Sequence, residues 1–158
     1  MGRQIDGYGL DAVIVGSDQV WRPKYARSIL RDFFLEFLDQ SDRPTKRISY
    51  AASFGSEKDE YGPVEKALAT PLLKSFDAVS VREDSAVTLC RDMFGVEAQH
   101  VLDPTLLLSQ DDYTDLLSED QRAASGDHLL TYVLDATSDK LDVITCISEA
   151  LSIEPRTT

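Results

Sequence analysis

The chain has 158 residues, of which 42% are hydrophobic, so it is long enough for one ordinary domain or for one domain and part of another. It carries 16 Lys and Arg residues against 28 Asp and Glu, a net charge of -12. Broad electrostatic binding to nucleic acid or to an anionic membrane requires surplus positive charge, so this balance argues against both. An anionic ligand must therefore be held by a local cluster of donors.

The two cysteines, Cys90 and Cys146, each fall in an apolar helical pattern without a nearby Cys or His, so neither a zinc site nor a disulfide framework is indicated. No apolar run approaches the roughly 20 residues of a membrane-spanning helix, and the N-terminus lacks the regions of a signal peptide. We expect a soluble cytoplasmic protein. The sequence shows no sign of a tightly held cofactor and leaves open whether a metal assists.

Strand-like and helix-like patterns alternate through the first two thirds of the chain. Short apolar runs predict strands, of which the first is buried and is ended by Gly16: 12–15, 48–55, 78–81 and 97–104. Pro63 favours the start of a helix that a second proline, Pro71, kinks. Asp84 or Ser85 can cap a further helix that ends at Gly95. This order predicts an α/β fold, a parallel sheet layered with helices.

The periodicity fades after residue 104, and the segment 109–126 is predicted as a linker with room for a short helix. The run 127–135 then reads as a strand, followed by a helix capped by Ser138 or Asp139 and a frayed tail, 153–158. A lone strand and helix leave an apolar face uncovered. We therefore expect residues 1–108 to form one domain and 127–158 to begin a second.

Ligands of parallel α/β sheets bind outside the carboxyl ends of the strands. The loops that leave those ends are 16–23, 53–60, 82–85 and 103–107. Arg82 follows a strand directly and can clamp a phosphate or carboxylate. In the alternative, Arg82 pairs with Glu83 or another acid while Asp84 and Ser85 cap the helix. The spacing does not decide between the two.

The turn Gly16, Ser17, Asp18 would let backbone amides and a carboxylate approach a ligand, although the spacing alone favours an ordinary turn with Asp18 as a cap. Trp21 could stack on a sugar or base, but a packing role is more common. His100 suits a core or edge position, and Asp103 with Pro104 ends a strand. Common motifs for nucleotides, zinc proteolysis and esterases are absent.

Four segments, taken in order, resemble the polysaccharide pyruvyl transferase family: VIVGSDQVW, ISYAASFG, FDAVSVREDSAVTLCRDMFGV and HVLDPTLLL, within about residues 11–113. The resemblance implies a GT-B-like architecture of two Rossmann-like domains with the active site between them. It also implies transfer of a pyruvyl group from phosphoenolpyruvate to two hydroxyls of a sugar or lipid-linked saccharide. The product would be a ketal on a bacterial surface polysaccharide or exopolysaccharide, and phosphate would be released.

Arg82 matches the arginine of the family's SVRE motif, and the resemblance implies that it binds the donor anion. Asp18, in GSDQVW, is the implied carboxylate near the acceptor hydroxyls, so these two are the catalytic candidates. The implied lining of the same cleft is Gly16, Ser17, Gln19, Trp21, Ser53, Asp84 and Ser85.

Members of the family normally have more chain before GSDQVW and a whole second domain, which supplies further basic residues to the donor site. We therefore expect this chain to be a fragment that does not turn over alone. Two other functions stay open. One is a non-catalytic binding or structural remnant that covers its exposed edge by forming a homodimer. The other is a GT-B nucleotide-sugar glycosyltransferase, because fold alone does not choose a function.

Overall fold

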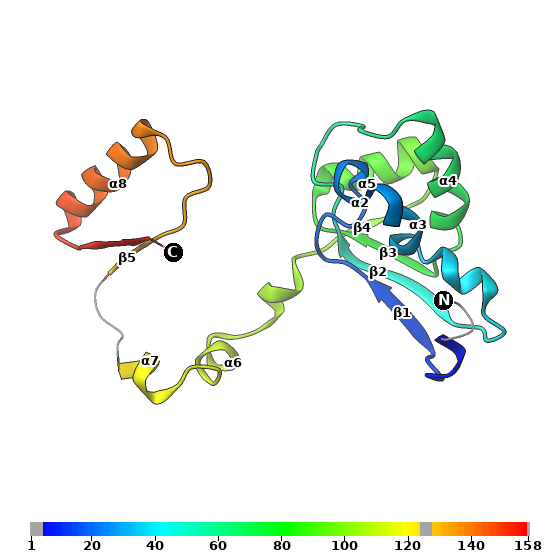
Figure 1. Cartoon of the computed structure of the whole chain (residues 1–158), viewed down its shortest axis with the longest axis horizontal. Coiled ribbons are helices and arrows are strands. Elements are labelled where there is room, and N and C mark those ends of the chain that lie inside the picture. The colour runs from blue at the N-terminus through cyan, green and yellow to red at the C-terminus, as the bar shows by residue number, and fades with distance from the viewer. Residues whose placement is uncertain (1–4, 124–127, 158) are drawn as a thin grey trace. The chain divides into compact units, whose positions relative to one another are not determined.

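The computed structural model describes residues 5–123 and 128–157 (Figure 1). The chain divides into two compact units, Met1–Leu108 and Ser109–Thr158, and each is described by itself.

The first unit contains a parallel sheet whose strands follow one another in chain order, β1-β2-β3-β4. The strands are β1 Ala12–Val15, β2 Lys46–Ala52, β3 Ala78–Val81 and β4 Gln99–His100. The predicted α/β class and parallel sheet are confirmed, and β1 and β3 have the predicted bounds. The fourth strand is shorter than predicted, because the chain turns at Asp103 into a 3-10 helix, Pro104–Leu107.

Helices connect these strands. They are α2 Pro23–Ala26, α3 Leu30–Phe33, α4 Pro63–Leu73 and α5 Asp84–Leu89, with 3-10 turns at Arg27–Ile29 and Glu36–Gln40. Pro63 lies in the first turn of α4, as predicted, and Pro71 lies inside this helix. The α5 helix continues as a π-helix, Cys90–Phe94, and ends at Gly95, whose φ of 63° is left-handed. The helical segments between β1 and β2 were not predicted.

The predicted cap of α5 is wrong. Its N-cap residue is Glu83, which makes no side-chain capping bond, so Asp84 begins the helix. The Asp84 carboxylate instead accepts a hydrogen bond from the N–H of Ser85 (2.7 Å). Glu83 is thereby placed at the junction of β3 and α5.

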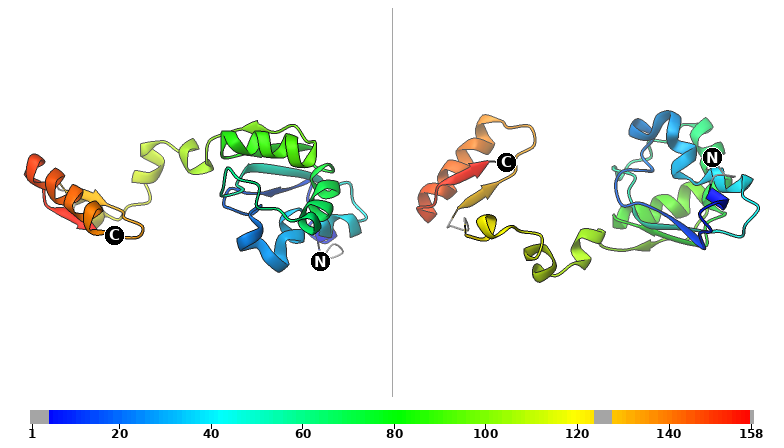
Figure 2. Two further views of the ribbon diagram at one scale, coloured as in Figure 1. Left: turned by 90° about the horizontal axis from the view of Figure 1, so that it is seen from above. Right: turned by 60° about the horizontal axis from the view of Figure 1, so that its bottom comes forward.

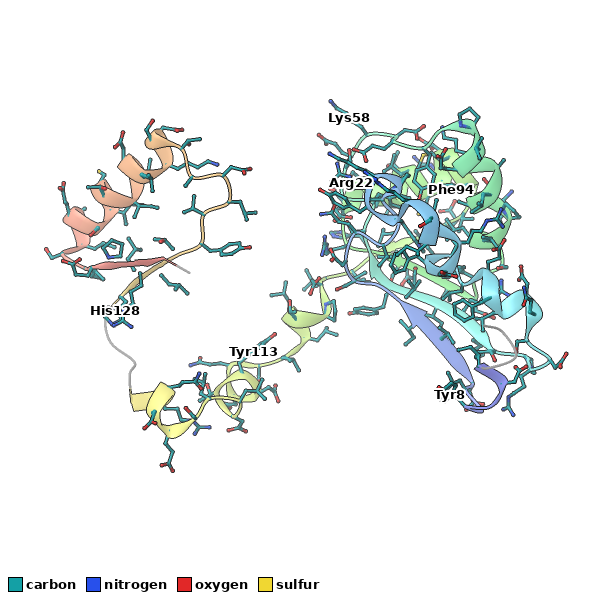
Figure 3. The ribbon with its side chains drawn as sticks, viewed as in Figure 1. Tyr8, Arg22, Lys58, Phe94, Tyr113 and His128 are labelled. Atoms are coloured by element: carbon teal, nitrogen blue, oxygen red, sulfur yellow. The ribbon has the colours of Figure 1, made fainter. Side chains whose placement is uncertain are left out.

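The core of this unit lies against one face of the sheet. Crossovers between parallel strands are right-handed as a rule, and between strands in chain order this rule places the connecting helices on one side of the sheet. Inward strand residues such as Val15 and Val81 form one cluster with apolar residues of α2 to α5. Phe94, labelled in Figure 3, lies within this cluster, 5.2 Å from the ring of Tyr61.

The opposite face of the sheet is open. Ile14 of β1 is 63% exposed, so the prediction of a buried first strand is wrong for this residue. Strand residues alternate between faces, and Val13 and Val15 take the covered side. Beyond β1, residues in and next to β2, β3 and β4 line a hollow of about 650 Å³ on the sheet, among them Ile48 and Tyr50 of β2 and Val101, which follows β4.

The second unit contains α6 Gln110–Thr114, α7 Glu119–Ala123, β5 Leu129–Thr131, α8 Ser138–Leu151 and β6 Pro155–Thr157. The strands β5 and β6 pair in parallel, and α8 lies along them (Figure 2). The predicted frayed tail is therefore wrong for Pro155–Thr157. The predicted strand start at Asp127 and the linker residues 124–126 lie outside the described residues.

The predicted cap of α8 is also displaced. Thr137 is its N-cap and makes no side-chain capping bond, so the helix begins at Ser138. Large apolar side chains of this unit stay exposed, for example Leu130 at 70% and Tyr132 at 74%. In neither described part of the chain is a helix long and apolar enough to cross a membrane.

Candidate functional site

Loops from the carboxyl ends of all strands of the first unit meet at one edge, as a parallel sheet requires. Backbone hydrogen bonds hold neighbouring loops together. The N–H of Ser53 donates to the carbonyl of Asp18 (3.1 Å), and that of Arg82 donates to Ala52 (3.2 Å). Polar side chains at the ends of adjacent strands are therefore close enough to interact.

Arg82 lies between two carboxylates. Its Nε donates to Oε1 of Glu83 (3.2 Å), and its Nη1 donates to Oδ2 of Asp103 (3.4 Å). Burial acts to lower the pKa of Arg82, but the hydrogen bonds to Glu83 and Asp103 outweigh it and raise this pKa. The guanidinium is thus charged, and within the described chain its Nη2 donates no hydrogen bond. Of the two alternatives that the spacing left open for Arg82, the pairing with Glu83 and another acid is present, without the caps expected beside it.

Glu83 links Arg82 to the loop that follows β2. The same Oε1 atom accepts a hydrogen bond from the hydroxyl of Ser53 (2.7 Å), a residue with no exposed surface. The Ser53 hydroxyl in turn accepts the N–H of Gly55 (2.9 Å). The second carboxylate oxygen, Oε2, is buried and has no hydrogen-bond partner among the described residues.

Asp103 links Arg82 to the loops after β4 and β1. Its Oδ1 accepts the backbone N–H (3.0 Å) and the hydroxyl (2.8 Å) of Thr105. These bonds, with further ones from Ser17 and Arg82, outweigh the effect of burial and lower the pKa of Asp103 to about 2. Side chains from all four strand ends are therefore joined. We call Ser17, Ser53, Arg82, Glu83 and Asp103 the strand-end network.

Asp18 and Gln19 lie beside the network. The Asp18 carboxylate accepts the N–H of Gln19 (2.7 Å), and both residues line a hollow of about 320 Å³ that extends to α2 and α3. Gln19 accepts a hydrogen bond from Arg22 (3.0 Å), which also makes two 2.8 Å bonds to Glu60. No bond joins the Asp18 side chain to Arg82 in the described structure.

Gly16 lies close against the backbone of β2. Its φ is 135°, and a Cβ atom there would lie 1.9 Å from the carbonyl oxygen of Tyr50. A side chain of any size would therefore force β1 and β2 apart at the site. The predicted tight turn is present, and the close approach that it permits is to β2.

Trp21 is the one candidate whose predicted role the structure excludes. It has no exposed surface, its ring stacks on Phe34 with centroids 5.2 Å apart, and its Nε1 donates to the carbonyl of Phe33 (3.1 Å). A ring that is completely buried cannot stack on a sugar. The alternative packing role is what the structure shows.

Asp84 and Ser85 bond to each other and not to the strand-end network, as far as the chain is described. His100 is exposed, and its Nε2 lies 3.0 Å from the carbonyl oxygen of Arg82, an edge position of the predicted kind. Glu83 and Asp103 were missed as members of the site. Their signal was an acid directly beside Arg82 and another at the end of the neighbouring strand.

A model of the family described as polysaccharide pyruvyl transferase matches residues 3–150. The chain belongs to the polysaccharide pyruvyl transferase family. The resemblance found in the sequence is confirmed, and the match extends into α8. No curated protein and no solved structure matches the chain.

Every residue of the strand-end network in this pyruvyl transferase family member falls in a segment that carries the resemblance. Ser17 belongs to VIVGSDQVW, Ser53 to ISYAASFG, Arg82 and Glu83 to SVREDS, and Asp103 to HVLDPTLLL. The network is what these separated segments build together. The described residues contain no cluster of three or more side chains suited to hold a metal ion.

Proposed function

We propose that this chain takes part in moving a pyruvyl group from phosphoenolpyruvate to two hydroxyls of a sugar in a surface polysaccharide. Family membership supports a polysaccharide acceptor and a pyruvyl group. The observation that carries the assignment to this site is Arg82 of the SVRE motif, held between Glu83 and Asp103 at the ends of the strands.

The proposed reaction sets requirements for the site. Two sugar oxygens bond to C2 of phosphoenolpyruvate, C3 takes up a proton to become a methyl group, and the bond from C2 to the phosphate oxygen breaks. Of the two hydroxyl protons, one balances C3 and the other leaves with phosphate. The donor's phosphate and carboxylate need cationic or N–H partners, and the acceptor hydroxyls need a base.

We assign the donor contact to Arg82, through its Nη2 atom, which donates no hydrogen bond to any described residue. Two carboxylates offset the charge of this guanidinium, so its part is to orient the donor while other cations supply net positive charge. We assign the acceptor contact to Asp18, which lines the hollow of about 320 Å³. Gly16, Ser17, Gln19, Asp84 and Ser85 would shape the surrounding cleft, and the fully buried Ser53 would support it from below through its hydrogen bond to Glu83.

Calorimetric titration with phosphoenolpyruvate tests this proposal. We expect saturable heat with the natural chain and affinity at least about tenfold weaker in Arg82→Ala, since a charged hydrogen bond is lost. Arg91→Ala is the matched control, because Arg91 is exposed and its ion pair is with the adjacent Asp92. Heat that persists unchanged in Arg82→Ala would remove the donor contact from this residue.

Two wider assignments belong to the same proposal. We place the parallel sheet in a Rossmann-like domain of a GT-B-like protein, which the β5-α8-β6 repeat of the parallel pattern in the second unit supports. We also place the protein in the cytoplasm, where its free thiols, Cys90 and Cys146, suit a reducing compartment. A nucleotide sugar that displaces phosphoenolpyruvate in the titration would favour a glycosyltransferase instead.

The open sheet face favours a second candidate, a non-catalytic protein in which a second copy of the chain covers that face. Ile14 is exposed there beside the hollow over β2 to β4, and two sheets can pack face to face. Light scattering distinguishes the candidates. A stable dimer that gives no heat with phosphoenolpyruvate would support this second role.

A further inference from the structure

We infer that Glu83 and Asp103 are positioning residues, which together orient the guanidinium of Arg82 so that Nη2 is the atom left for the donor anion. The inference rests on the proposed function for its consequence, because it concerns the same contact. Its structural part, that two carboxylates hold one side chain, stands on the hydrogen bonds alone.

Each of the two carboxylates accepts hydrogen bonds from Arg82 and from a second residue that anchors it. Glu83 accepts from Nε of Arg82 and also from the hydroxyl of Ser53, which is buried at the end of β2. Asp103 accepts from Nη1 and is anchored by the N–H and hydroxyl of Thr105. Each carboxylate is therefore held in place by a group other than Arg82. Because the guanidinium is planar, two fixed acceptors, one on Nε and one on Nη1, set the orientation of its plane.

The backbone of Arg82 is held as well. Its N–H donates to the carbonyl of Ala52 (3.2 Å), and its carbonyl oxygen lies 3.0 Å from Nε2 of His100. Both ends of the residue are thus tied to neighbouring strands. Little freedom is left to the guanidinium while both carboxylates are present, so ordering it for a ligand costs little entropy.

The direction in which donor affinity changes when a carboxylate is neutralised distinguishes a positioning role from the mere closeness of two charges. Glu83 and Asp103 are both negative, so removal of either charge should strengthen the binding of any anion nearby, by about twofold or more. Loss of orientation acts in the opposite direction, and coupled neighbours typically change affinity by about threefold or more. A variant that lacks the charge and binds the donor more weakly therefore reveals a positioning role.

The first experiment follows the Nε–H signal of Arg82 by NMR in the whole chain, with no ligand present. We expect a slowly exchanging, ordered Nε–H in the natural protein that becomes as mobile as those of exposed arginines in Glu83→Gln. Asp92→Asn removes an equal charge from an exposed ion pair and should leave the signal unchanged. An Arg82 signal that stays ordered in both Glu83→Gln and Asp103→Asn overturns the inference.

The second experiment titrates phosphoenolpyruvate into Glu83→Gln, Asp103→Asn and Asp92→Asn. We expect weaker binding for the first two, about threefold or more, and no loss for the third. Stronger binding in Glu83→Gln and Asp103→Asn would show neighbouring charges only and would overturn the positioning role. Absence of heat in the natural chain would refute the donor contact of the proposed function, while the NMR result would still decide whether the carboxylates hold Arg82.

Discussion

Asp103 makes the strand-end network sensitive to acid. Its folded pKa, about 2, lies below the value near 3.9 of an ordinary aspartate, because Thr105 and then Ser17 and Arg82 hydrogen-bond to the ionised carboxylate. A lowered pKa in the folded state means that ionised Asp103 stabilises the fold. This contribution is complete above about pH 4 and is lost as the pH falls through about 2.

Asp103→Asn should therefore lower the melting temperature at pH 7 and by the same amount at pH 5. Between about pH 4 and pH 2 the difference from the natural chain should shrink, because the natural carboxyl becomes neutral as well. Thermal unfolding followed by circular dichroism measures it. Asp92→Asn, at an exposed pair, controls for net charge. A difference that stays constant down to pH 2 would contradict the assignment.

For single residues, the family resemblance and the observed geometry point to different members of the site. The SVRE match points to Arg82 alone, whereas the structure adds Glu83 and Asp103 as its partners. Trp21 shows the opposite case, a residue in the matched segment GSDQVW that contributes to the core. A residue in a matched family segment can contact a ligand or pack in the core, and only its burial in the structure distinguishes the two.

At the scale of the elements, the pairing of β2 with β3 is irregular just before Ser53. The register shifts between Ser49 and Ala52, and Ala51 has a positive φ of 51°. Serine hydroxyls supply hydrogen bonds across this irregularity. Ser80 Oγ donates to the carbonyl of Ser49 (2.8 Å) and accepts the N–H of Ala51 (3.2 Å). The polar side chains thus satisfy backbone groups that a regular ladder would pair.

Ser80→Ala should destabilise the first unit by about 1–3 kcal/mol, because it leaves the buried N–H of Ala51 without a partner. Denaturant unfolding should show a lower midpoint with an unchanged slope. Ser28→Ala, at an exposed position in the same unit, should change stability by no more than about 0.5 kcal/mol. Equal stability of the two variants would mean that the hydroxyl of Ser80 is dispensable.

At the scale of the whole molecule, the hydrophobic core belongs to the first unit. All the members of the core cluster lie within Met1–Leu108, among them Trp21, the only tryptophan of the chain. The first unit therefore contains a hydrophobic core of its own. Trp21 fluorescence reports on this unit alone.

A chain that ends at Leu108 should fold and unfold like the first unit of the full protein. We expect the midpoint followed by Trp21 fluorescence to agree within a few degrees between the two, since the core cluster is made of residues that the shorter chain keeps. The same melt followed by far-ultraviolet circular dichroism should lose the part due to the second unit. A midpoint far below that of the full chain would show that the second unit stabilises the first.

The sequence by itself determined the parallel α/β class, the bounds of β1 and β3, the helix that begins at Pro63 and the family. These follow from local patterns: apolar runs, the lack of an N–H at proline and recognisable segments. The strand-end network, the covered and open faces of the sheet, the burial of Trp21 and the strand β6 were decided by tertiary structure. Ser53 and Glu83 are 30 residues apart and Arg82 and Asp103 are 21 apart, so strand register and crossover handedness bring them together.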